Sequence, residues 1–176
     1  MRDEEFWQAC VDAKEQLARR QSEFFQQATS KTQILDAALS AGGWQRGAAL
    51  AFLAELNDDV ALLPRLVDLA MRPAWARQAR RAIVNIPREQ LFPSLERVLT
   101  AELDQVTDED DDYYSLWVAL LAEAEAWSLL AQVAKAAQNS SNPDVQHVAA
   151  WTAQTYGALI TAPTGPRRPA RRHGEN

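Results

Sequence analysis

Apolar residues recur at three- and four-residue steps through most of the chain, whereas alternation with a period of two is almost absent. These steps predict one long amphipathic helix over 3–28, with apolar positions at Phe6, Cys10, Ala13, Leu17 and Phe24. We expect Cys10 to pack on the apolar side of this helix as a small hydrophobic residue. Since alanine, leucine, glutamine, glutamate and arginine dominate the periodic segments, the pattern predicts an all-α fold.

Glycine and proline separate the periodic segments and indicate where the helices end. A second helix is predicted over 31–41, because Thr29 or Ser30 can cap its start and Gly42-Gly43 follows its end. Further breaks are expected at Pro73, at Pro87, across 139–143 and at Gly157.

From residue 44 the chain repeats itself. A shift of 31 residues places Trp44 on Trp75, Ala48 on Ala79 and Ala51 on Ala82. The helix that follows repeats at a shift of 29, which places 62–66 on 91–95. A third copy covers 114–138, and the first helix of a fourth covers 142–157. A period of about 30–45 residues with two helices per unit predicts a short right-handed α-solenoid.

The segment 143–153 resembles the first helix of a HEAT repeat. Pro143, Asp144 and Val145 are followed by the paired alanines Ala149-Ala150, although Gln146 stands where that family usually has arginine. The resemblance covers about 44–157, roughly two thirds of the chain. It implies a domain of HEAT-like helix pairs over 44–160, with the helices of 1–43 as an N-terminal cap. The prolines and glycines among the arginines of 161–176 predict a disordered basic tail.

Charge is distributed unevenly along the 176 residues. The chain has 18 Lys and Arg against 24 Asp and Glu, a net charge of −6. Residues 161–176 carry four arginines and one glutamate, so the rest of the chain has a net charge of −9. An acidic body repels phosphate backbones and attracts basic partners.

Composition also bears on compartment. The sequence contains no run of 18 apolar residues, so it predicts no membrane-spanning helix, and its N-terminus lacks the pattern of a secretory signal. We therefore expect a cytoplasmic protein without a membrane partner. The 15 arginines against three lysines, together with abundant alanine, are typical of a bacterial protein encoded by a GC-rich genome.

An acidic run followed by aromatic residues is the first candidate contact surface. Its residues are Asp104, Asp108, Glu109, Asp110, Asp111, Asp112, Tyr113 and Tyr114. We expect at least one tyrosine to be exposed, because tyrosine framed by carboxylates is typical of protein recognition, and we expect Trp117 to lie in the core. The alternative is a solvated loop whose aspartates stabilise the next helix N-terminus. An EF-hand calcium loop is disfavoured, because Tyr113 and Ala119 occupy the glycine and glutamate positions.

Basic residues give a second set of candidates. Arg72, Arg77, Arg80, Arg81 and Arg88 either form ion pairs with acidic residues of neighbouring repeats or make a nucleic-acid patch. The resemblance to HEAT repeats keeps the second option open, since some HEAT-like proteins are DNA glycosylases. Arg65, Asp68 and Arg97 lie on second helices, which in solenoids commonly line the concave binding face.

Catalytic motifs are absent from the sequence. It has no glycine-rich phosphate loop, no Gly-x-Ser-x-Gly elbow and no His-Glu-x-x-His motif. One cysteine and two histidines leave little for a zinc site, so we expect no metal and no cofactor. The sequence favours a non-catalytic protein-binding solenoid, one version being an inhibitor or immunity-type protein that occludes a basic partner such as a toxin. The alternatives are a nucleic-acid-binding or base-processing protein that uses the arginines, and a chaperone-like or lyase-type helper of a cofactor-bearing enzyme.

Overall fold

The chain is all-helical in the part that the computed structural model describes, residues 2–104 and 111–161. No strand occurs in these ranges, so the prediction of an all-α fold is confirmed. The elements in chain order are α1 (Asp3–Gln27), α2 (Lys31–Ala41), α3 (Gly43–Leu53), the 3-10 helix η1 (Val60–Leu62), α4 (Leu63–Ala70), α5 (Ala76–Val84), α6 (Arg88–Leu103), α7 (Asp111–Glu123), α8 (Trp127–Gln138) and α9 (Pro143–Ile160). The tail predicted over 161–176 lies outside the described residues except for Thr161.

Local sequence signals explain where individual helices begin and end. Asn142 caps α9, because its side-chain oxygen accepts a hydrogen bond from the backbone N–H of Asp144 at 2.9 Å. Pro143 then occupies the first turn, where its missing N–H costs little. Gly42 and Gly43, with φ values of 82° and 51°, separate α2 from α3 in a conformation that side chains avoid.

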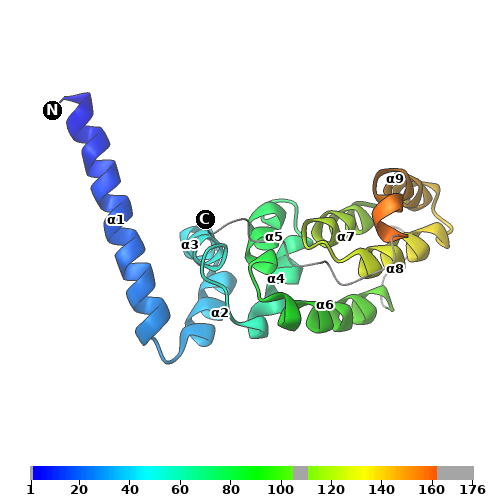
Figure 1. Ribbon diagram of the computed structural model, residues 1–176, viewed down its shortest axis with the longest axis horizontal. Coiled ribbons are helices and arrows are strands. Elements are labelled where there is room, and N and C mark those ends of the chain that lie inside the picture. The colour runs from blue at the N-terminus through cyan, green and yellow to red at the C-terminus, as the bar shows by residue number, and fades with distance from the viewer. Residues whose placement is uncertain (1, 105–110, 162–176) are drawn as a thin grey trace, which may run out of the picture.

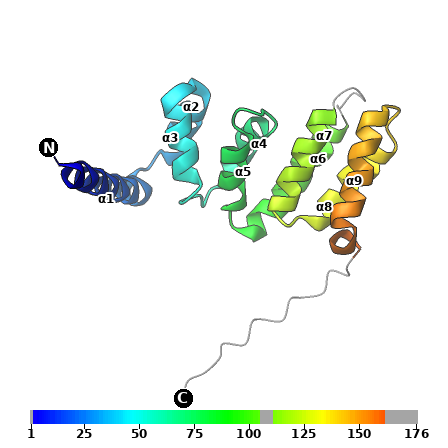
Figure 2. The same ribbon diagram turned by 90° about the horizontal axis from the view of Figure 1, so that it is seen from above.

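Helices α2 to α9 form an elongated array in chain order (Figure 2). Successive helices pack closely at α2–α3, α4–α5, α7–α8 and α8–α9. Helices two positions apart also contact each other, with α3, α5, α7 and α9 in one series and α4, α6 and α8 in the other. The array therefore has two layers of helices.

The closest helix pairs agree with the third predicted unit, since α7 packs against α8, but they differ from the first. The repeats in the sequence joined α3 with α4 and placed the cap boundary after residue 43, whereas α2 packs against α3 and α4 against α5. Ala79 and Ala82 of α5 are fully buried, and their small side chains permit neighbouring helices to approach closely. The boundary at 43 therefore separates two helices that pack together.

Burial corrects the register of the first-helix repeat. At the predicted shift of 31, Ala48 and Ala51 should match Ala79 and Ala82, but the first pair is exposed and the second is fully buried. A shift of 30 instead places buried Leu53 on buried Ile83 and Ala49 on Ala79. One residue rotates a helical position by about 100°, so identical letters at a shift of 31 face different directions.

Helix α1 stands apart from the array. It runs away from α2 and α3 and meets the body near its C-terminal end (Figure 1). None of its residues 3–27 is buried, and its two side chains that pack against the core are Phe24 and Phe25. The expectation that α1 covers the first repeat as a cap is therefore wrong for residues 3–23. Cys10 is exposed rather than packed, because no helix lies against that part of α1.

Candidate partner-binding surfaces

Four carboxylates gather where α6 ends and α7 begins, and we call them the acidic corner: Glu102, Asp104, Asp111 and Asp112. All four are exposed, and among the described residues none of them forms an ion pair. Asp111 and Asp112 lie in the first turn of α7, where negative charge stabilises the helix. Asp108, Glu109 and Asp110, which belong to the same predicted surface, lie outside the described residues.

The two tyrosines beside the acidic corner are less accessible than predicted. Tyr114 is 5% exposed, because it lies three and four residues before the buried Trp117 and Val118 and shares their side of α7. Its assignment as a partner contact is wrong in this conformation, whereas the prediction that Trp117 lies in the core is confirmed. Tyr113 is half-buried, and its hydroxyl donates a hydrogen bond to Glu102 at 2.6 Å. Burial, and then this hydrogen bond, raise the pKa of Tyr113 above its ordinary value.

Most of the candidate arginines are engaged by carboxylates. Arg80 pairs with Glu123 at 2.9 Å, Arg88 with Glu125 at 3.3 Å, and Arg72 with Asp68 one turn away at 2.9 Å. The first two pairs connect the α5–α6 region to the end of α7, which is the ion pairing between neighbouring repeats that we predicted. Arg77 and Arg81 remain exposed, and no ion pair to either occurs within residues 2–104 and 111–161. These two are the members of the patch that a phosphate could reach.

The candidate residues on second helices form ion pairs or hydrogen bonds with nearby side chains. Arg65 of α4 lies 3.3 Å from Asp36 of α2, and Asp68 accepts both hydrogen bonds from Arg72. Arg97 donates to Ser94 at 3.2 Å. All of these side chains are at least partly exposed, so each ion pair contributes little to stability. The structure therefore does not bring Arg65, Asp68 and Arg97 together into one cluster.

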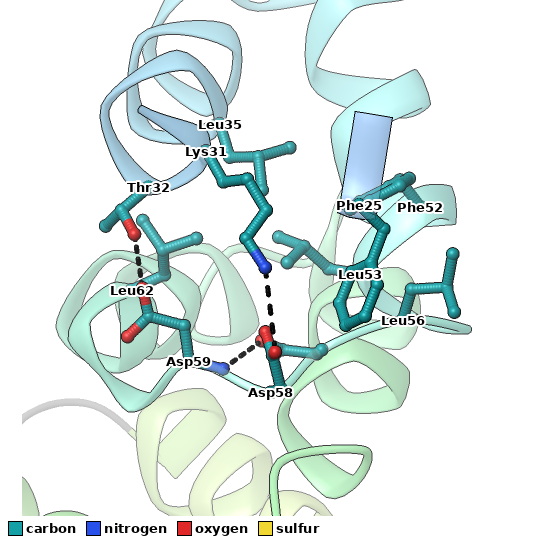
Figure 3. A pocket seen from close by; sticks show the side chains of 11 residues that line it. Phe25, Lys31, Thr32, Leu35, Phe52, Leu53, Leu56, Asp58, Asp59 and Leu62 are labelled. Atoms are coloured by element: carbon teal, nitrogen blue, oxygen red, sulfur yellow. Dashed lines mark hydrogen bonds and ion pairs between the residues drawn. The ribbon is translucent and has the colours of Figure 1, made fainter. Parts of the chain in front are cut away.

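A pocket lies where α1 joins the array (Figure 3). Its lining includes Phe25 of α1, Lys31 and Thr32 of α2, and Asp58 and Asp59 from the segment before η1. Lys31 lies 3.6 Å from the Asp58 carboxylate and 4.1 Å above the Phe25 ring, and the Thr32 hydroxyl donates to Asp59. The free space is about 10 Å³, enough for one water molecule at most. This pocket is therefore a junction that fixes the base of α1 and not a ligand site.

A larger groove, of about 630 Å³, lies between α8 and α9. Small-molecule sites usually combine such a volume with several converging polar groups. Here five of the eleven lining residues are alanine, and the polar members are Lys135, Gln138, Gln146 and Thr161. The groove reflects the absence of large side chains along this pair of helices.

Three large apolar side chains of α1 are exposed. Phe6, Trp7 and Leu17 are 53%, 71% and 57% exposed, and together with Ile34 and Trp44 they include most of the large exposed apolar side chains of the described chain. At 100° per residue, one stripe of about 140° contains these three residues and the smaller apolar residues Cys10, Val11 and Ala18, together with Asp3, Lys14 and Gln21. We call its six apolar members the α1 apolar face: Phe6, Trp7, Cys10, Val11, Leu17 and Ala18. Apolar spacing in the sequence predicts Phe6, Cys10 and Leu17 on this side of the helix but misses Trp7, Val11 and Ala18, and the expected packing against the first repeat does not occur along residues 3–23.

Among the described residues no three His, Cys, Asp or Glu side chains are grouped as metal ligands, and no described helix is long and apolar enough to cross a membrane. No family model matches the chain, and no curated protein or solved structure matches it either.

Proposed function

We propose that the chain is a short HEAT-like α-solenoid that binds another protein without catalysis, and that α1 is its contact element. The two series of contacting helices and the repeated apolar positions from residue 44 support the solenoid. The family label rests on the residues of α9 quoted above, beginning at Pro143.

One observation carries the binding function: a 25-residue amphipathic helix has no buried residue. In proteins, most of the stability of a helix comes from packing its apolar side, and α1 has that side without a neighbour along most of its length. Exposed apolar surface of this kind marks a site of protein association. Complete burial of a Phe, Trp or Leu side chain contributes roughly 1.5–3 kcal/mol, so covering the exposed parts of three such residues is a substantial driving force.

Capture of partners by a tagged full-length chain tests this function. The double variant Trp7→Glu/Leu17→Glu places charge on the α1 apolar face, and Gln16→Glu is a matched control on the polar side of the same helix. We expect the double variant to lose the proteins that the native chain and Gln16→Glu capture in stoichiometric amounts, as measured by mass spectrometry. Equal capture by all three chains would refute the role of α1.

A second candidate, occlusion of a basic partner, is favoured by the acidic corner. Its four carboxylates are exposed and form no ion pair with a described lysine or arginine, whereas Asp36, Asp68 and Glu123 are each paired with an arginine. Unpaired surface charge speeds the encounter with an oppositely charged protein. A basic toxin held by an immunity-type inhibitor would be such a partner.

Association kinetics with a captured basic protein test this second candidate. Neutralising Asp104, Asp111 and Asp112 to asparagine should slow association about tenfold at low salt and flatten its dependence on salt. Neutralising Glu89, Glu96 and Asp144, which are exposed elsewhere, removes the same charge and is the control. Equal rates for the two triple variants would show that only net charge matters and that the acidic corner is not the contact.

A further inference from the structure

The base of α1 is fixed on the body, whereas its outer part is free. Phe24 meets Phe52 with ring centroids 5.4 Å apart, and Phe25 lies beneath the Lys31 ammonium. Both phenylalanines lie at the same angular positions as the α1 apolar face, because Phe24 is 18 residues, or five turns, after Phe6 and Phe25 is 18 after Trp7. The apolar face therefore continues from the core outward along a helix about 37 Å long.

Charge along α1 is asymmetric. The outer part, 3–12, carries Asp3, Glu4, Glu5 and Asp12 and no cation. The inner part, 14–23, carries Lys14, Arg19 and Arg20 against Glu15 and Glu23. Two parallel copies of this helix would place the acidic parts together, whereas two antiparallel copies place each acidic part beside the cations of the other. Helix α1 is thus complementary in charge to itself in the antiparallel orientation.

We propose that α1 pairs with α1 of a second copy of this chain, antiparallel and centred near Asp12. In this register Phe6 and Trp7 of one copy cover Leu17 and Ala18 of the other. Near the centre, Cys10 of one copy lies at the level of Lys14 of the other, whose aliphatic stem can lie over the small cysteine side chain while its ammonium group stays in solvent. Glu4 and Glu5 then lie at the level of Arg19 and Arg20 of the second copy. Because Glu5, Arg19 and Arg20 project more than about 100° away from the middle of the apolar face, this attraction acts between the two helices as a whole and not as ion pairs within the seam. This inference rests on the proposed function, since it names the partner of the α1 apolar face.

The area available is sufficient for a weak but specific dimer. Aromatic side chains bury roughly 150–250 Å² each, and more than half of Phe6 and Trp7 is still exposed. In two copies these residues alone supply roughly 450 Å², and Leu17, Cys10, Val11 and Ala18 extend the contact toward the roughly 1,000 Å² that a specific interface requires. An interface at this lower limit is typical of weak association, so the dimer should form only at high protein concentration.

Sedimentation velocity of the full-length chain from 1 to 300 µM tests for the dimer. We expect a monomer–dimer equilibrium that Trp7→Glu/Leu17→Glu weakens at least 30-fold and Gln16→Glu leaves within threefold. Glu4→Lys/Glu5→Lys should weaken the dimer about tenfold, and combining it with Arg19→Glu/Arg20→Glu should restore it, because the charges are then exchanged between the two parts. Helicity by circular dichroism verifies that each variant keeps α1.

Cysteine cross-linking tests the orientation. Cys10 is the only cysteine of the chain, and the antiparallel register places its two copies about 6 Å apart along the helix axis. A short bismaleimide should join them. In Asp3→Cys/Cys10→Ser the two cysteines would be about 27 Å apart when antiparallel and one helix spacing apart when parallel. Efficient cross-linking of that variant would overturn the antiparallel arrangement.

The outcomes separate this inference from the function on which it rests. A chain that stays monomeric at 300 µM, or a dimer that persists in Trp7→Glu/Leu17→Glu, overturns the self-pairing of α1. If a monomeric native chain still captures proteins that this variant loses, the proposed function stands and its partner is a different protein. If neither self-association nor capture depends on the α1 apolar face, both proposals fail.

Discussion

Replacing Asn57 by alanine should destabilise the array although the side chain lies in an irregular segment. Asn57 is 5% exposed and donates from Nδ2 to the carbonyl oxygen of Ala82 at 2.9 Å. That carbonyl is one of the last four of α5, which have no partner within their own helix. The side-chain oxygen of Asn57 also accepts from the backbone N–H of Asp59 at 3.3 Å. One side chain thus connects the segment after α3 to the end of α5.

The expected cost follows from the burial of these groups. Leaving a buried carbonyl without a donor costs about 1–3 kcal/mol, so we expect Asn57→Ala to lower the free energy of unfolding by about 2 kcal/mol. For a chain of this size, the melting temperature should fall by about 4–8 °C. Asn57→Asp should cost at least as much, because a carboxylate oxygen would then face the carbonyl of Ala82.

Urea denaturation followed by circular dichroism at 222 nm and by tryptophan fluorescence measures this change. Helical arrays can unfold in parts, so the two signals must coincide and the slope with urea must stay constant before free energies are compared. Asn85→Ala is the control, since Asn85 is exposed and its bond to the carbonyl of Leu53 is long, at 3.5 Å. We expect a cost of less than about 0.5 kcal/mol there. Equal costs for the two variants would refute the reasoning from burial.

Three further predictions concern the array. Trp117→Ala should lower the free energy of unfolding by about 3–5 kcal/mol, because the side chain is fully buried, whereas Trp44→Ala, at a 95% exposed position, should change it by less than about 0.5 kcal/mol in the same urea titration. A double-mutant cycle on Arg80 and Glu123 should give a coupling of about 0.5–1 kcal/mol, and a value of zero would contradict the ion pair. Because burial raises the pKa of Tyr113, folding favours its neutral phenol. This contribution to stability is complete below about pH 10 and is lost as the pH rises above that value. Between pH 9 and 11.5, Tyr113→Phe should therefore lose less stability than the native chain, and parallel losses would contradict this.

The sequence predicted the elements of the array well, because apolar periodicity and helix-end residues act locally. The helix predicted over 31–41 has the same bounds as α2, and the fourth unit starts at Asn142-Pro143, as expected from its cap. The repeat of the second helices at a shift of 29 also agrees with burial, since Leu62 and Leu66 are buried like Leu91 and Leu95. Each of these features depends on residues within one or two turns.

The remaining errors arise where position depends on contacts between helices. Apolar periodicity predicts that Tyr114 lies in a helix. Which side of that helix faces the core depends on its packing against α5, α8 and α9. The register of α3 against α5 was wrong by one residue because repeated alanines can face a neighbouring helix or solvent equally well. Only the three-dimensional arrangement distinguishes the two.

The same distinction explains α1. Amphipathic spacing shows that a helix has a side to bury, but it does not show whether the partner belongs to the same chain. The buried core lies in the part of the chain from α2 to α9, and of the apolar side chains of α1 only Phe24 and Phe25 pack against it. The α1 apolar face therefore adds nothing that the array needs in order to fold, beyond the contacts of Phe24 and Phe25 at its base. A helix that folding does not need, with an apolar side and a charge distribution complementary to its own reverse, has the properties of an association element.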